Sequence, residues 1–238
     1  MKLDILAFGA HPDDVELGAG GTVAKCISEG KKIGIVDITA GELGTRGDVA
    51  TRAREAAESA KLLGISVREN LGLPDGFFNN SREYQLPVIT MIRRYQPEII
   101  LANAITDRHP DHGKGASLIE ESCFLSGLMK IETNDNGKKQ EAWRPRLVLH
   151  YIQDRYIRPD VVIDITAHIE KKMESIKAFR SQFFDTNSKE KATYISSEMF
   201  LESLYARAME YGKNIGVKYS EGFTCSRMVG VKGLDFLI

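Results

Sequence analysis

Two short segments of the chain combine histidine with aspartate. The first, AHPDDVELGAGG, covers residues 10–21, and the second, TDRHPDHGKG, covers residues 106–115. Together they offer six side chains that can bind metal ions: His11, Asp13, Asp14, His109, Asp111 and His112. Imidazole and carboxylate groups suit Zn²⁺, and a catalytic zinc keeps three protein ligands and leaves one position open. The two segments therefore predict one metal centre, provided that the fold brings them together.

The adjacent carboxylates of Asp13 and Asp14 allow a division of labour. A carboxylate that binds a metal ion is a poor base, whereas its neighbour stays free to take a proton from water. The chemistry that this favours is metal-assisted hydrolysis of an amide or an ester. Taken alone, the first segment is equally consistent with a strand-to-helix turn in which one of these aspartates is the N-cap.

The segments around these motifs alternate between apolar β-rich runs and helical patterns. We expect strands at residues 3–9, 33–39, 67–73, 98–104, 146–152 and 161–166. We expect helices near residues 18–29, 50–63, 82–95, 113–130, 167–180 and 197–212. Several strands are apolar on both faces, as a parallel sheet covered by helices requires. The alternation predicts an α/β fold with one domain over residues 1–238: a Rossmann-like, doubly wound, mostly parallel sheet with helices on both faces.

Three polar loops are expected at one edge of this sheet. Both histidine motifs follow predicted strands, and so does the glycine-rich loop at residues 41–49. In open α/β sheets, ligands bind outside the carboxyl ends of the strands, so the three loops should converge on one crevice. Residues 133–139 are predicted to be a surface turn, and residues 213–238 an appended strand or an irregular tail.

The composition argues against several classes of partner. The 32 Lys and Arg residues balance 33 Asp and Glu residues, which argues against broad binding to nucleic acid or to membrane surfaces. No apolar run is long enough to cross a bilayer, and the N-terminus lacks the features of a signal peptide. The three cysteines are far apart and odd in number, so neither a disulfide framework nor a thiolate zinc cluster is indicated. We expect a cytoplasmic protein.

The paired motifs resemble those of the LmbE-like (PIG-L) family of zinc-dependent N-acetylglucosamine deacetylases. The resemblance covers most of the chain, through HPDD, TAGELGTRG, TRAREA, LPDG, HPDH and a late YSEGF, in that order. The GELGTRG and YSEGF elements and the length most resemble the bacillithiol-biosynthesis branch, which acts on N-acetylglucosaminyl-malate. The resemblance implies a small amino-sugar substrate, release of acetate, one zinc ion per chain and a homo-oligomer, trimeric or hexameric. Other divalent metals remain an alternative to zinc.

The family pattern also implies roles for individual residues. His11, Asp14 and His112 match the zinc ligands, and Asp13 matches the general base. His109 matches a histidine near the oxyanion, which acts either as a general acid or as an oxyanion stabiliser. Six further residues are expected to contact the substrate: Glu42, Arg46, Arg52, Asp107, Arg108 and Tyr194. For Asp107 and Arg108, orientation of His109 is the alternative, and Glu221 is matched by local pattern only.

Other interpretations stay open at this point. The same chemistry could act on another N-acylated amino sugar or small amide. A nucleotide-binding Rossmann-like module is a distant alternative, because Asp37 lies within a strand rather than at its end and the G-x-G-x-x-G spacing is missing. We interpret Gly18, Gly20 and Gly21 as permitting close packing of the first helix on the sheet. Glu16 is either a partner of a ligand histidine or a first-turn acid favoured by the helix dipole.

Overall fold

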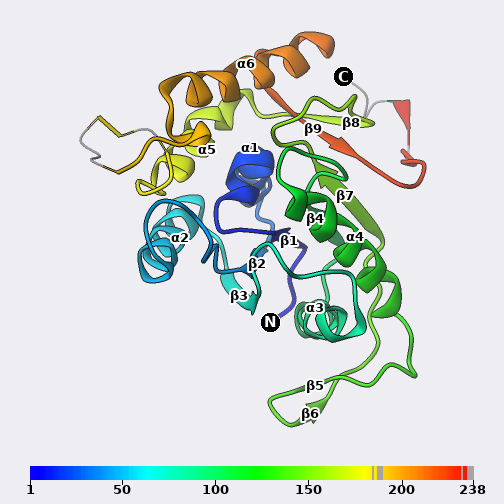
Figure 1. The fold of residues 1–238 in the computed structure, drawn as a ribbon. Helices are drawn as coiled ribbons and strands as arrows, with labels where there is room; N and C mark the ends of the chain where they lie inside the picture. The colour runs from blue at the N-terminus through cyan, green and yellow to red at the C-terminus, as the bar shows by residue number, and fades with distance from the viewer. Residues whose placement is uncertain (184, 187–189, 232, 235–238) are drawn as a thin grey trace.

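The computed structural model describes residues 1–183, 185–186, 190–231 and 233–234, and these form one α/β unit around a seven-stranded sheet (Figure 1). The strand order is β3-β2-β1-β4-β7-β9-β8. The first five strands in this order are parallel, and β9 runs antiparallel to both of its neighbours. The strands are β1 (Ile5–Gly9), β2 (Ile33–Thr39), β3 (Val67–Leu73), β4 (Ile99–Ala102), β7 (Leu147–Tyr151), β8 (Val161–Asp164) and β9 (Ser220–Thr224).

Helices cover both faces of the sheet because its central strands are apolar on both sides. In β1, Ile5 and Ala7 pack on the face of α1, whereas Leu6 and Phe8 pack with α3 and α4, as the alternation of side chains along a strand dictates. Helices α2, α5 and α6 pack around α1 on its side of the sheet (Figure 1). The helices are α1 (Asp14–Ser28), α2 (Val49–Leu63), α3 (Arg82–Tyr95), α4 (Pro110–Leu125), α5 (Ile169–Lys177) and α6 (Glu198–Asn214). The predicted fold class is confirmed.

Two helices begin earlier than the sequence pattern predicted, and both carry a histidine motif. Helix α1 begins at Asp14 rather than near residue 18, and α4 begins at Pro110 rather than near residue 113. Proline fits the first helical turn because its missing N–H has no partner there in any case. Asp14, Asp111 and His112 therefore occupy the first turns of helices, where their side chains are held more rigidly than in a loop, whereas Asp13 and His109 are the N-caps and His11 lies on the loop before α1.

Two segments differ from their expected form. Residues 133–139 form a hairpin of β5 (Asn134–Asp135) and β6 (Lys138–Lys139). The C-terminal strand β9 is inserted between β7 and β8 instead of being appended at an edge, so that the chain after α6 returns into the sheet. Of the predicted tail, residue 232 and residues 235–238 lie outside the described residues. In the described ranges, no helix has both the length and the hydrophobicity that spanning a bilayer requires.

The glycines of α1 allow the helix to lie close to its neighbours. A Cβ atom on Gly18 would overlap the ring of Tyr151 in β7, and one on Gly21 would lie 2.6 Å from Ile165. Close packing on the sheet is therefore confirmed for Gly18, against β7, and for Gly21, against the residue that follows β8, whereas a Cβ on Gly20 would lie 3.2 Å from Lys172 in α5. The close approach brings the first turn of α1 over the carboxyl ends of the sheet strands.

Candidate active site

A cavity of about 290 Å³ opens where the strands end. Most of the candidate residues from the sequence line it: His11, Asp13, Asp14, Arg46, Arg52, Arg108, His109, His112 and Tyr194. Its wall also contains residues from the loop after β7, from α6 and from the loop after β3, including Asp75, Gln153, Asp154 and Arg207. The expected convergence of separate loops on one crevice is confirmed.

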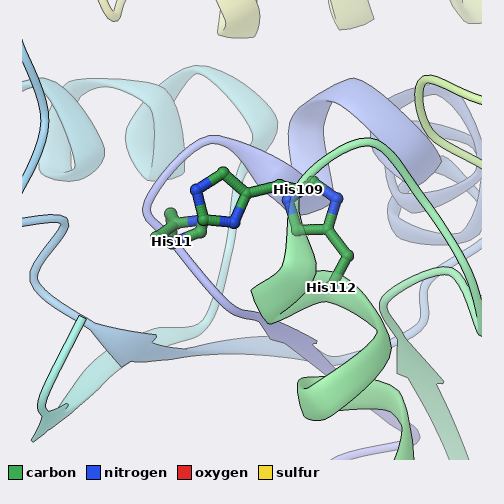
Figure 2. A group of neighbouring side chains, drawn as sticks. All are labelled: His11, His109 and His112. Atoms are coloured by element: carbon green, nitrogen blue, oxygen red, sulfur yellow. The ribbon is translucent and has the colours of Figure 1, made fainter. Parts of the chain in front are cut away.

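The two histidine motifs meet because β1 and β4 are neighbours in the sheet. Figure 2 shows His11 on the loop after β1, facing His109 and His112 at the start of α4. The ring centroids of His11 and His109 lie 4.6 Å apart, and those of His11 and His112 lie 5.8 Å apart. A side-chain nitrogen from each of the three histidines lies within 4.8 Å of the others, which makes them a group that could hold a metal ion.

The hydrogen bonds of two of these rings determine which nitrogen faces the centre. Nδ1 of His112 lies 2.6 Å from Asp107 Oδ2, and Nε2 of His11 lies 3.1 Å from Asp75 Oδ1. A metal-binding histidine commonly donates its other ring N–H to a carboxylate in this way. The remaining nitrogens face Asp14, with His112 Nε2 3.2 Å from Oδ1 and His11 Nδ1 3.5 Å from Oδ2.

This donor set fits a divalent cation. Ligand atoms about 2.1 Å from a tetrahedral ion lie about 3.4 Å from one another, close to the 3.2 Å between Asp14 Oδ1 and His112 Nε2, and His11 Nδ1 approaches the other oxygen of the same carboxylate at 3.5 Å. Lone pairs that face each other at this distance need a positive charge between them. Asp75 and Asp111 form a second group with His11. Their oxygens accept hydrogen bonds from Leu43 N, Gly76 N and Lys114 Nζ. Asp75 and Asp111 are therefore structural supports of the site.

A proton can supply that positive charge in the protein without metal. Burial opposes protonation of His112, but the charge of Asp14 and the hydrogen bond to Asp107 raise its pKa to about 9. Burial acts the same way on His11, and hydrogen bonds with Asp111, Asp14 and Asp75 raise its pKa well above the usual value. Binding of a cation between these groups would release the protons.

Asp13 has an unusual backbone and an unusual acidity. It occupies the N-cap position of α1 with φ 124°, and its carboxylate accepts no capping hydrogen bond. A non-glycine residue with such a φ stores strain, which is typical of functional positions. Burial raises the pKa of Asp13 to about 7, although the charge of Arg52 acts in the opposite direction. A pKa near neutrality suits a group that accepts and returns a proton.

Arg52 holds Asp13 in place. Its NH2 donates to Asp13 Oδ2 at 2.9 Å and to Pro12 O at 3.2 Å, and its NH1 donates to Gly41 O at 3.3 Å. The guanidinium therefore connects the loop after β2 to the HPDD loop after β1. The nearby Arg54 instead donates to Thr51 Oγ1 at 2.9 Å, on the exposed side of α2 and away from the cavity.

Tyr194 and Arg108 form part of the cavity rim. The guanidinium of Arg108 lies 4.6 Å from the ring centroid of Tyr194. Both side chains contact the carboxylate of Asp154, Arg108 Nε at 3.3 Å and Tyr194 Oη at 3.0 Å. Arg207 on α6 adds a further cation, and its NH2 donates to Asp154 O at 3.3 Å. Asp154 thus organises the cationic side of the cavity.

Three residues lie elsewhere than expected. Asp107 bonds His112 rather than His109 and does not line the cavity. Glu42 is exposed, and its carboxylate accepts a hydrogen bond from Asp75 N at 2.8 Å. Glu221 is buried away from the cavity and pairs with Lys172 at 2.6 Å. Glu16 is a first-turn acid of α1, as the second of its two interpretations expected, and its carboxylate pairs with Arg68 at 2.6 Å rather than with a histidine.

Some site residues carry no motif that sequence analysis could single out. Asn103 and Gln153 follow β4 and β7, and both bond Asp14. Asp75 could have been singled out from the sequence, because the LPDG segment places it in a turn directly after the third predicted strand. Position at the carboxyl end of a strand is the feature that these three residues share.

The comparisons with known proteins agree with this geometry. Residues 6–123 match the PIG-L family, described as GlcNAc-PI de-N-acetylase. A conserved protein of Thermus thermophilus has a solved structure with TM-score 0.86 and 32% identity, and the match covers 97% of this chain and 98% of that one. The chain therefore belongs to the PIG-L (LmbE-like) family.

Two further relatives have named activities. The N,N'-diacetylchitobiose deacetylase of Pyrococcus horikoshii is 29% identical with TM-score 0.78, covering 92% of this chain and 82% of that one. The 4-oxalmesaconate hydratase of Pseudomonas putida is 26% identical over 74% of this chain and 73% of its own length. Relatives in this range thus include proteins named for deacetylation and for hydration.

Proposed function

We propose that this protein hydrolyses the N-acetyl amide of an amino sugar, giving a free amine and acetate. The observation that supports this most directly is the position of Asp13, a buried carboxyl held by Arg52 NH2 at 2.9 Å, directly beside the His11, Asp14 and His112 donor set. A base next to a metal site is an arrangement that can hydrolyse an unactivated amide. The similarity to a diacetylchitobiose deacetylase supports an N-acetylated sugar as the substrate.

His11, Asp14 and His112 would hold one zinc ion. When bound, zinc supplies Lewis acidity toward the amide carbonyl and makes water easier to deprotonate. Asp13 takes a proton from the water that attacks the carbonyl carbon. As the C–N bond breaks, Asp13 passes this proton to the departing nitrogen, so the products are the amine and acetate. Arg52 keeps the Asp13 carboxylate oriented during both transfers.

His109 acts as a neutral hydrogen-bond donor toward the oxyanion. Its Nδ1 accepts a hydrogen bond from Asp111 N at 3.3 Å, as the N-cap of α4, and Nε2 therefore carries the hydrogen. Burial and the nearby His11 and His112 lower the pKa of His109, which favours the neutral ring. A preorganised N–H donor of this kind stabilises the charge that develops on the carbonyl oxygen.

N-acetylglucosaminyl-malate is the substrate that we favour. Its malate carboxylates need cationic partners, and bidentate contacts to arginine are the strongest of these. Arg108 and Arg207 line the same side of the cavity, close to Tyr194. Assembly into a trimer or hexamer stays a prediction from the family resemblance.

Release of acetate by the zinc-loaded protein tests the proposal. We expect turnover of N-acetylglucosaminyl-malate, and slower turnover of N-acetylglucosamine and diacetylchitobiose, which lack the carboxylates. A chelator should remove the activity, and added Zn²⁺ should restore it. No acetate from any of the three substrates, with stoichiometric zinc present, would contradict the proposal. If the protein instead adds water to an unsaturated dicarboxylate, its activity would be that of a hydratase, like the Pseudomonas putida relative.

A further inference from the structure

Two buried amide side chains hold both oxygens of Asp14. Asn103 follows β4 and is fully buried, and Gln153 follows β7 and is 3% exposed. Asn103 Nδ2 donates to Asp14 Oδ2 at 2.9 Å, and Gln153 Nε2 donates to Asp14 Oδ1 at 2.9 Å. Three neighbouring elements, α1, β4 and β7, are therefore joined at this one carboxylate.

The orientation of the two amides follows from a backbone donor. Ala10 N donates to Asn103 Oδ1 at 2.8 Å, so the other end of that amide, which faces Asp14, is the NH₂ group. Asn103 Nδ2 also lies 2.9 Å from Gln153 Oε1, which leaves Gln153 Nε2 directed at Asp14. Each amide fixes the orientation of the next, and the backbone of the HPDD loop fixes the first.

The hydrogen bonds leave the two oxygens of Asp14 unequal. Oδ2 accepts from His11 N at 2.9 Å and from Asn103 Nδ2 at the same distance, which engages both of its lone pairs. Oδ1 accepts one hydrogen bond from Gln153 and retains a lone pair on the side of His112 Nε2. The free coordinating capacity of the carboxylate is thus concentrated on a single atom.

We propose that Asn103 and Gln153 are positioning residues that make Asp14 bind the cation through Oδ1 alone. This rests on the proposed function only in requiring that His11, Asp14 and His112 bind a metal ion. A carboxylate that binds through one oxygen keeps the coordination number low, as zinc favours when one position stays open. Binding through both oxygens would raise the coordination number and suit metals that prefer more oxygen ligands.

Zinc affinity in Gln153→Met tests the hydrogen bond to Oδ1. Methionine keeps the side-chain length but donates no hydrogen bond, and we expect the dissociation constant for Zn²⁺ to rise by about 10–100-fold. The matched control is Gln140→Met, on the loop after β6 and outside the cavity wall, where Nε2 donates to Thr90 O at 3.0 Å. It removes a comparable amide and should leave zinc affinity unchanged. Equal zinc affinities for wild type and Gln153→Met would overturn the proposal.

The visible spectrum of the Co²⁺-substituted protein tests the role of Asn103. In Asn103→Leu, Oδ2 regains a lone pair, so the cation can bind both oxygens and its coordination number increases. Cobalt bands weaken when tetrahedral geometry is lost, and we expect this in Asn103→Leu but not in Gln140→Met. Unchanged bands would contradict binding through one oxygen. Because Asn103 also accepts from Ala10, the Gln153→Met result stands as the test if Asn103→Leu fails to fold.

Neither measurement requires a substrate. If the wild type binds zinc but releases no acetate, the proposed function fails and the roles of Asn103 and Gln153 stand on the affinity and spectral results. If the wild type releases acetate and the two variants match it in zinc affinity and cobalt spectrum, the function stands and the positioning role fails.

Discussion

The HPDD loop after β1 and the HPDH loop after β4 have nearly the same sequence, and adjacent strands present them at the same edge of the sheet. Their fourth residues, Asp14 and His112, converge to 3.2 Å. Their third residues diverge, because Asp13 faces the cavity and Arg52 whereas Asp111 is fully buried and bonds Gly76 N and Lys114. Two motifs of nearly the same sequence thus place different groups at their third position: Asp13 is available as a base, and Asp111 is a buried structural support.

The cause of this divergence lies in how each helix begins. In the second loop, His109 has an extended backbone with φ −82° and caps α4 through its own side chain. In the first loop, Asp13 has φ 124° and caps nothing, which leaves its carboxylate available for chemistry. An uncapped, strained helix start costs stability, and we infer that the first loop retains it because the base must stand beside the metal ligand.

The strongest test of this contrast compares Asp13→Asn with Asp111→Asn. The first removes the proton acceptor, and we expect kcat for acetate release to fall by about 10²–10⁴-fold with zinc content unchanged. The second keeps the size of the side chain and leaves Asp13 in place, so the loss in kcat should be much smaller. Steady-state kinetics measure kcat for both variants, and metal analysis measures their zinc content. Equal losses in kcat would show that the third positions are equivalent after all.

A second test compares the carboxylates that orient the two ligand rings. Removing such a partner weakens metal binding by about 10–100-fold. We expect Asp107→Ala to lie at the upper end of this range, because Asp107 lies 2.6 Å from His112, and Asp75→Ala at the lower end, because Asp75 lies 3.1 Å from His11. Competition with a chromophoric chelator measures both. The reverse order would mean that the HPDD loop depends more on its orienting carboxylate than the HPDH loop does.

The difference between the loops also explains what could be predicted from sequence. The proposed ligands His11, Asp14 and His112 lie in short motifs, and the rule that parallel strands present their carboxyl ends together is enough to group them. The expectation that Asp107 contacts the substrate or orients His109 was wrong, because His109 and His112 are both near in sequence and only the turn of α4 places His112 beside Asp107.

Long-range contacts account for the rest of the differences. The pairing of Asn103 with Gln153 depends on β4 and β7 being neighbours, and neither amide belongs to a recognisable motif. Glu221 was matched by local pattern, but insertion of β9 between β7 and β8 places it beside Lys172. A strand that returns from the end of the chain can pair at several places, and hydrophobic periodicity does not distinguish among them.

The most specific test compares backbone strain, because the two loops should respond with opposite signs. Asp13→Gly and Asp13→Ala both lose the carboxylate, so their difference reports the backbone alone. Glycine accepts φ 124° without strain, and we expect Asp13→Gly to exceed Asp13→Ala in free energy of unfolding by about 1–3 kcal/mol. At Asp111, in the first turn of α4, alanine should instead be more stable than glycine by about 0.5–1 kcal/mol. Urea unfolding of the four metal-free variants measures both differences. The same sign at both positions would mean that strain at Asp13 is not what separates the two loops, and that the carboxylate of Asp13 is available for another reason.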